Sequence, residues 1–137
     1  MTKYPIGIFI SGRGTNLKSI IDASKDSNFP GNIILVFSDN PDAKGMELAY
    51  ENNIDTFSLN INNFEDTNRF EEEILRLIKP YNLELICLAG YMKILSKGFI
   101  DKFSGKIINI HPSLLPKYKG LNTHRRVIEN METISGC

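Results

Sequence analysis

The sequence lacks the features that mark several large classes of protein. Its formal net charge is +0, so bulk electrostatics favours neither a nucleic acid nor an anionic membrane as partner. No apolar run approaches the roughly 20 residues that a membrane helix needs, and no leader peptide is recognisable at the N-terminus. No cluster of side chains suggests a metal site. These absences favour a cytoplasmic enzyme or binding domain.

Cysteine is also scarce, with only Cys87 and Cys137 in the chain. Two cysteines do not make a disulfide framework, and Cys87 lies inside an apolar run, where a small buried thiol is expected. The 137 residues, 42% of them hydrophobic and 23% charged, give room for one globular domain with one core. There is no internal repeat and no low-complexity segment.

Apolar runs typical of buried strands alternate with segments of helical periodicity. The expected strands cover residues 6–10, 33–37, 56–59, 85–89 and 107–110. The first expected helix begins near Leu17, and the second begins at Asn40-Pro41 and ends near Asn52. The third contains an apolar stripe from Phe70 onward, the fourth begins at Ile94, and the last begins near Thr123. This alternation predicts an α/β fold, a Rossmann-like open and mainly parallel sheet with helices on both faces. The Glu71-Glu72-Glu73 run is expected to form a solvated face of the third helix.

Ligands of such sheets bind beyond the carboxyl ends of the strands, so candidate functional residues are expected in the loops there. The first is Ser11-Gly12-Arg13-Gly14-Thr15-Asn16. Its glycines allow close approach to an anion, and free N–H groups at a helix start point at one. Gly14, Thr15 and Asn16 are therefore candidate phosphate ligands, the alternative being a tight turn capped by Asn16. Leu17 replaces the third glycine of a dinucleotide fingerprint, which disfavours a dinucleotide.

The second loop follows the fourth expected strand and reads Gly90-Tyr91-Met92-Lys93-Ile94-Leu95. Its apolar side chains can line a slot for a flat ring system, and backbone N–H and C=O groups would form hydrogen bonds with the polar edge of that ring system. On spacing alone, the same side chains can equally belong to the core at a helix entry.

The third loop carries Asn109 and His111, two apart at the end of the fifth expected strand and therefore on one face. An imidazole there can exchange a proton near neutral pH, and a carboxamide N–H can donate to an oxyanion. Pro112 stiffens the exit from the strand. The second histidine, His124, opens the last helix and is either an ordinary first-turn residue or a contact to a substrate phosphate.

Three stretches together resemble the phosphoribosylglycinamide formyltransferase family, which uses 10-formyltetrahydrofolate in purine biosynthesis. They are Ile10–Leu17, Leu88–Leu95 and Asn109–Arg125. The resemblance implies the formyltransferase fold and transfer of a formyl group to the amine of glycinamide ribonucleotide. It also implies small-molecule substrates, with no nucleic acid and no membrane as partner, and that no metal takes part.

The resemblance assigns the site residues as well. Gly14, Thr15 and Asn16 would bind the ribonucleotide phosphate, and Met92, Lys93, Ile94 and Leu95 the pterin. Asn109 would contact the formyl group and the folate, and His111 would be the general acid and base. In the family an arginine near the start of the third helix binds folate. Thr67 takes that position in this sequence, so Arg69, two residues on, is the candidate folate-binding arginine.

The family continues beyond this sequence into further strands and a loop whose aspartate pairs with the histidine. We therefore expect residues 1–137 to be a single formyltransferase domain lacking its C-terminal strands and that aspartate loop. His111 would then lose part of its acid strength. The fifth strand would lie at an open edge, which allows pairing with another copy as a homo-oligomer.

Two neighbouring activities share the folate site, a formyltetrahydrofolate hydrolase (deformylase) and a methionyl-tRNA formyltransferase. Pro112 stands where the hydrolase motif has a second histidine. The phosphate loop differs from that of the tRNA enzyme, and no basic extension is present. The remaining alternative is an inactive nucleotide-binding fragment.

Overall fold

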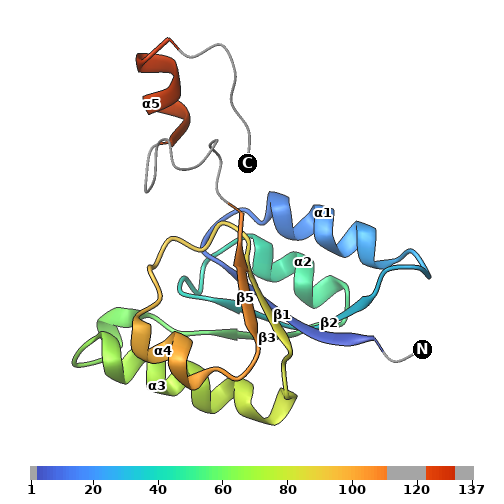
Figure 1. Ribbon diagram of the computed structural model, residues 1–137, viewed down its shortest axis with the longest axis horizontal. Helices are drawn as coiled ribbons and strands as arrows, with labels where there is room; N and C mark the ends of the chain where they lie inside the picture. Colours follow the sequence, from blue (N-terminus) through green and yellow to red (C-terminus); the bar gives the residue numbers. More distant parts are fainter. Residues whose placement is uncertain (1–2, 111–122, 132–137) are drawn as a thin grey trace.

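One parallel sheet organises the structure, which is a computed structural model describing residues 3–110 and 123–131, without the side chains of residues 123, 124 and 127. The strands are β1 (Tyr4–Ile10), β2 (Gly31–Ser38), β3 (Asp55–Ser58), β4 (Leu85–Leu88) and β5 (Lys106–Asn109). They lie in the order β3-β2-β1-β4-β5, and each neighbouring pair is parallel (Figure 1). The predicted α/β class and parallel sheet are therefore confirmed.

Helices cover both faces of the sheet, as predicted. On one face lie α1 (Thr15–Ser24) and α2 (Gly45–Glu51), and on the other lie α3 (Thr67–Ile78) and α4 (Lys97–Lys102) (Figure 1). Short 3-10 helices follow β3 and α3, at Ile61–Asn63 and Lys79–Tyr81, and α5 spans Thr123–Glu129. Among the described helices, none combines the length and the apolar character needed to cross a membrane.

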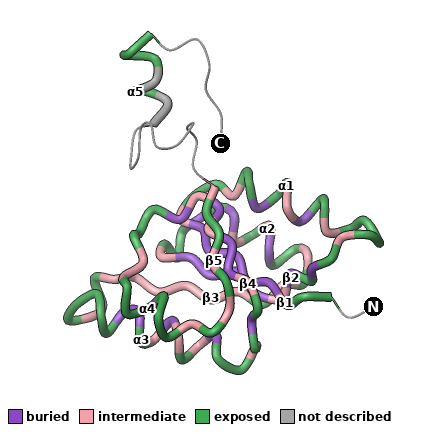
Figure 2. Tube along the Cα trace, in the orientation of Figure 1, coloured by how far each residue is buried: buried purple, intermediate pink, exposed green. Residues whose placement is uncertain are grey.

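Strand alternation divides the core into two layers, because successive side chains of a strand point to opposite faces. Ile8 and Ile10 face α1 and α2 and join an aliphatic cluster with Leu17 of α1. Phe9, between them, faces α3 and α4 and joins an aromatic cluster. Its ring centroid lies 4.9 Å from that of Phe37 and 5.4 Å from that of Tyr91. Figure 2 shows the buried backbone concentrated in the central strands.

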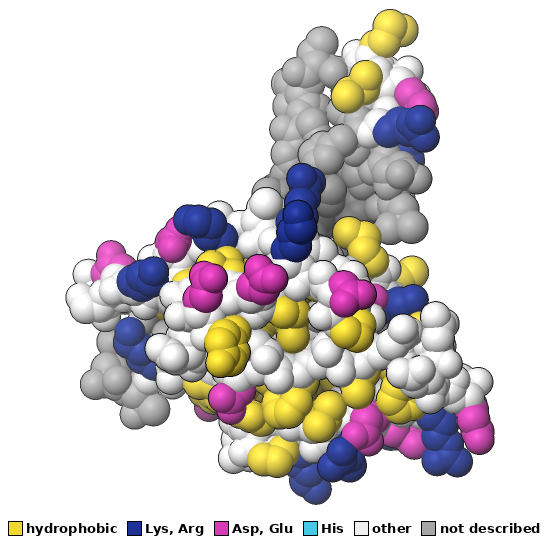
Figure 3. All heavy atoms as spheres, turned by 180° about the vertical axis from the view of Figure 1, so that it is seen from behind, with side chains coloured by type: hydrophobic (Ala, Val, Ile, Leu, Met, Phe, Trp, Pro, Cys, Tyr) yellow, Lys and Arg dark blue, Asp and Glu magenta, His cyan; other side chains and the backbone are white. Residues whose placement is uncertain are grey.

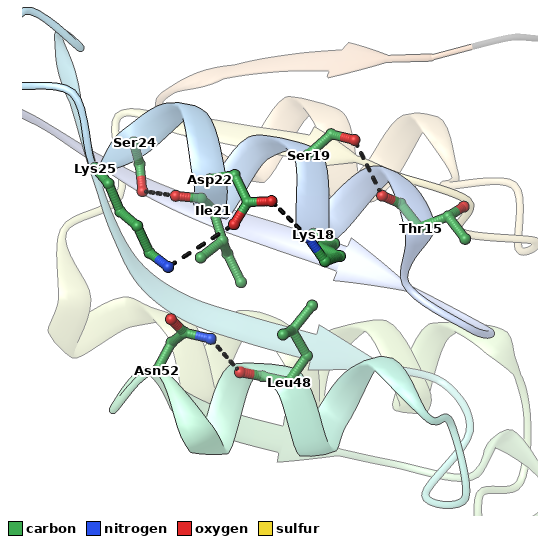
Figure 4. A network of polar contacts seen from close by, with 9 residues as sticks. All are labelled: Thr15, Lys18, Ser19, Ile21, Asp22, Ser24, Lys25, Leu48 and Asn52. Atoms are coloured by element: carbon green, nitrogen blue, oxygen red, sulfur yellow. Dashed lines mark hydrogen bonds and ion pairs between the residues drawn. The ribbon is translucent and has the colours of Figure 1, made fainter.

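Helix α1 is amphipathic, as its spacing of apolar residues predicted. Its side chain Ile21 is buried and points toward Leu48 of α2 (Figure 4). On the outer side, Lys18 Nζ lies 2.7 Å from one carboxylate oxygen of Asp22, and Lys25 Nζ lies 3.8 Å from the other. Such exposed pairs contribute little to stability, so packing against the sheet holds α1 in place.

Strand β5 lies at the edge of the described sheet and is only half covered. Ile107 packs against the aromatic cluster beside α4. Ile108, on the opposite face, pairs in register with Cys87 and remains 52% exposed. The expected burial of Cys87 is confirmed.

Several predicted boundaries were wrong. The second helix begins at Gly45 instead of at Asn40-Pro41, because Asn40 accepts the N–H of Asp42 and forms a turn there. The fourth begins after Ser96, whose hydroxyl caps it, and not at Ile94. The third helix begins at Thr67, near the expected start, and contains the apolar stripe predicted from Phe70 onward; Asp66 caps it by accepting the N–H of Arg69.

Candidate functional site

The candidate site lies at the carboxyl edge of the sheet, between β1 and β4. The chain passes from β1 to β2 on one side, and later reaches β4 on the other side of β1. In parallel sheets, ligands bind outside the strand ends at such a reversal. The loops that follow β1 and β4 flank this position, and β5 ends beside β4.

The loop after β1 leads directly into α1 through Gly14. This glycine is the N-cap residue in the left-handed conformation, with φ of 78°, and no side chain caps the helix. Asn16 is thus not the cap. Thr15 and Asn16 are exposed in the first turn, which contains no acidic residue. The positive end of the helix dipole is therefore open to an anion without a competing carboxylate.

The start of α2 packs against this loop backbone to backbone. Gly45 N–H donates to the carbonyl oxygen of Gly12 at 3.2 Å. A Cβ at position 14 would lie 2.7 Å from Gly45 Cα, and one at position 45 would lie 2.5 Å from Ile10 Cδ1. Helix α2 begins at Gly45 and not at Asn40-Pro41 because the turn at Asn40 places Gly45 against this loop.

The loop after β4, which we call the β4–α4 loop (residues 90–96), begins with Gly90 at φ of 77°. The Met92 N–H donates to the Ser11 hydroxyl oxygen at 2.8 Å, which joins this loop to the loop after β1. Met92 is 59% exposed and Ile94 92% exposed, so neither belongs to the core at a helix entry. Leu95 is half-buried against the aromatic cluster, and Lys93 is exposed.

The far end of the β4–α4 loop is held by Glu71 of α3. This residue is only 5% exposed, so the predicted solvated glutamate run was wrong at its first position. The Glu71 carboxylate accepts the Ser96 N–H at 2.9 Å, and its other oxygen accepts the Ser96 hydroxyl. Ser96 Oγ in turn accepts the Phe99 N–H at 3.1 Å, which caps α4.

Two further polar groups lie buried at this edge. The hydroxyl of Tyr91 and Oδ1 of Asp39 have no hydrogen-bond partner among the described residues. Burial raises the pKa of Tyr91, and the nearby carboxylates of Asp39 and Glu71 raise this pKa further. Tyr91 therefore keeps its proton at neutral pH.

Asn109 is the last residue of β5, in register with Leu88 at the end of β4, and is exposed. The Ile110 N–H donates to Leu88 O at 3.3 Å and extends the ladder by one bond. The structure thus brings Asn109 to the edge that carries both loops. His111 lies outside the described residues, as does the side chain of His124.

Arg69 lies in the first turn of α3 and is exposed. Its guanidinium Nη1 lies 3.6 Å from Glu72 on the same helix, so its assignment to folate stays a prediction. Figure 3 shows charges of both signs interspersed over the described part of one face, in keeping with the zero net charge. A hollow of about 1020 Å³ lies at the opposite, amino-terminal edge of the sheet, and none of the predicted site residues lines it.

Sequence reasoning missed Ser11, Glu71 and Ser96 as residues that shape the site. Glu71 lies three residues before Ile74 and seven before Ile78, a spacing that places it on the buried face of the helix. Ser96, three residues before the buried Phe99, has the position of a helix cap. Both signals were present in the sequence, whereas the contact of Ser11 with Met92 joins residues 81 apart.

Comparison with known proteins identifies the family. The family model described as "Formyl transferase" matches residues 5–137. The chain belongs to the formyl transferase family. The predicted resemblance is thereby confirmed, and both loops and the end of β5 fall within the matched residues.

Within this family, the chain is similar to phosphoribosylglycinamide formyltransferases. It is 43% identical to that of Escherichia coli strain K12 over 125 residues, which are 91% of this chain and 59% of the relative. A solved phosphoribosylglycinamide formyltransferase from Brucella melitensis is 38% identical, with a TM-score of 0.92 over 98% of this chain and 70% of the other. A second solved structure, the phosphoribosylglycinamide formyltransferase from Coxiella burnetii in complex with CHES, is 42% identical, with a TM-score of 0.90 over 98% of this chain and 64% of the other. The chain therefore spans about three fifths of the length of its Escherichia coli relative.

Proposed function

We propose that this protein transfers a formyl group from 10-formyltetrahydrofolate to the amine of 5-phosphoribosylglycinamide, a step of purine biosynthesis, in the cytoplasm. Its relatives named as phosphoribosylglycinamide formyltransferases support the proposal. The observation that carries it is the hydrogen bond from Met92 N–H to Ser11 Oγ. This bond joins a loop suited to a phosphate directly to a loop with exposed apolar side chains, so the two would serve one site.

The difference in character between the two loops supports a separate role for each. The open N-terminus of α1, with Gly14, Thr15 and Asn16, would bind the substrate phosphate through backbone N–H groups and polar side chains. Met92, Lys93, Ile94 and Leu95 would hold the pterin of the folate, through apolar contact and the backbone.

The chemistry would occur at the end of β5. The substrate amine attacks the formyl carbon, and the C–N bond forms as the carbonyl π electrons move to oxygen. Asn109 would donate a hydrogen bond to this oxyanion, and protonated His111 would stabilise the same intermediate. The bond from the formyl carbon to the folate nitrogen then breaks, and a proton from the amine leaves with tetrahydrofolate.

The decisive experiment measures formyl transfer in the longest form of the chain that its gene encodes. His111→Ala should lower kcat by about 100-fold or more, because general acid–base catalysis typically contributes that much. Asn32→Ala, an exposed change on β2, is the matched control and should keep normal turnover. Full turnover by His111→Ala would refute the role of His111. Hydrolysis of 10-formyltetrahydrofolate without an acceptor would support the deformylase alternative instead.

A further inference from the structure

Glu71 is the buried member of a run of three glutamates. It is 5% exposed, whereas Glu72 beside it is exposed and lies 3.6 Å from Arg69 on the same helix. A buried carboxylate is costly unless hydrogen bonds compensate for its lost hydration. Here both carboxylate oxygens are compensated by one residue, Ser96, through its N–H and its hydroxyl.

The polarity of these bonds requires a carboxylate. The Ser96 N–H can only donate, and the single proton of its hydroxyl points to Glu71 because its oxygen already accepts the Phe99 N–H. Both positions facing Ser96 must therefore be acceptors. A glutamine would present an NH₂ group to one of the two donors, with nearly unchanged volume.

The two bonds fix the far end of the β4–α4 loop, while the Ser11 hydroxyl fixes its near end at Met92. Only Lys93, Ile94 and Leu95 lie between these anchors, and Ile94 is 92% exposed. A short segment anchored at both ends has few conformations available, so its exposed apolar side chains are held ready for a ligand.

We propose that Glu71 is a positioning residue for the folate subsite. It does not touch the folate, and it holds Ser96 so that residues 92–95 keep the conformation that receives the pterin. This inference rests on the proposed formyltransferase function. A purely structural role, joining α3 to α4, would instead lower stability without distinguishing between the two substrates.

The test compares E71Q with E72Q, the same substitution at the exposed neighbour, in the longest encoded form of the chain. For E71Q we expect the KM for 10-formyltetrahydrofolate to rise at least fivefold. The KM for 5-phosphoribosylglycinamide should stay within twofold and kcat within threefold. E72Q should leave all three constants within twofold. S96A, which removes the hydroxyl donor to Glu71 together with the cap of α4, should raise the folate KM in the same selective way by a smaller factor.

Equal rises in both KM values, or a lower Tm with an unchanged folate KM, would overturn the positioning role. If E71Q does not fold, the S96A result decides the question alone, and an unchanged folate KM would refute the proposal. Absence of formyl transfer by the unaltered chain would refute the proposed function together with this inference. Normal transfer by the unaltered chain with no selective effect in the variants would refute the inference alone.

Discussion

The two loops that follow β1 and β4 each use a glycine in the same left-handed conformation, with φ of 78° at Gly14 and 77° at Gly90. Their surroundings differ. A Cβ at Gly14 would lie 2.7 Å from Gly45 Cα, whereas one at Gly90 would meet no atom within 4 Å, apart from its chain neighbours. The loop after β1 is therefore shaped by backbone packing. The β4–α4 loop is shaped by the hydrogen bonds that it donates to Ser11 and Glu71, which leave space beside Gly90.

This difference makes the loop after β1 the less tolerant of the two. At Gly14 the left-handed conformation and the contact with α2 both require glycine, so one substitution causes two independent penalties. At Gly90 only the conformation requires it. The same φ angle thus has different consequences, depending on what lies beside the backbone.

The largest effect is expected for Gly14→Ala. The left-handed conformation costs about 1 kcal/mol for a residue with a Cβ, and the overlap with Gly45 adds about 2 kcal/mol by forcing α1 and α2 apart. Chemical denaturation should show a loss of about 3 kcal/mol in the free energy of unfolding, with weaker binding of the substrate phosphate. A loss no greater than that of Gly90→Ala would show that the Gly14–Gly45 contact is not restrictive.

Ile94→Ser tests the other loop. Ile94 is 92% exposed, so the free energy of unfolding should change by less than about 0.5 kcal/mol. Loss of apolar contact with the pterin should weaken folate binding by about tenfold, equivalent to about 1.4 kcal/mol. Titration with 10-formyltetrahydrofolate measures the binding. An unchanged affinity would remove Ile94 from the folate site.

Gly90→Ala should cost about 1 kcal/mol of unfolding free energy, the penalty for the left-handed conformation alone. Denaturation of this variant beside Gly14→Ala isolates the contribution of packing. Should the two losses be equal, the proposed difference between the loops would not hold.

Tyr91→Phe should have the smallest effect and the opposite sign. It removes a buried hydroxyl without a partner among the described residues and should raise the unfolding free energy by about 0.5–1 kcal/mol at neutral pH. Because burial raises the pKa of Tyr91 in the folded state, the unfolded chain releases this proton first as pH increases. The unaltered protein should therefore lose stability above about pH 10, and Tyr91→Phe should lose less. A destabilised variant at neutral pH would indicate that the hydroxyl has a partner.

The sequence was sufficient to predict the order of strands and helices, because strands buried on both faces are apolar throughout. Ile33–Phe37 is such a run and lies within β2. The rule for parallel sheets also selected the loops to read for function, and the structure joins two of them through Met92 and Ser11. Helix starts were less predictable, because they depend on contacts between elements. Gly45 begins α2 where its N–H meets Gly12 O, and no local signal marks that partner.

The contacts within the site show the same limit. Periodicity in α3 could have identified Glu71 as buried, but its partner lies 25 residues away. The hydrogen bond from Met92 to Ser11 likewise follows from the packing of β1 beside β4, and the sequence of either loop does not encode it alone. The roles of Asn109, Arg69 and His111 remain predictions that depend on the family resemblance.

The contact between Gly14 and Gly45 also limits how this protein can change over generations. In most cores, a side chain that becomes too large can be accommodated when a neighbour becomes smaller. At this contact each added Cβ would meet backbone or Ile10, and position 45 already has the smallest possible residue. A genetic selection for second-site suppressors of Gly14→Ala should therefore return no substitution at position 45. Recovery is expected only by reversion, or by distant changes that raise the stability of the whole protein.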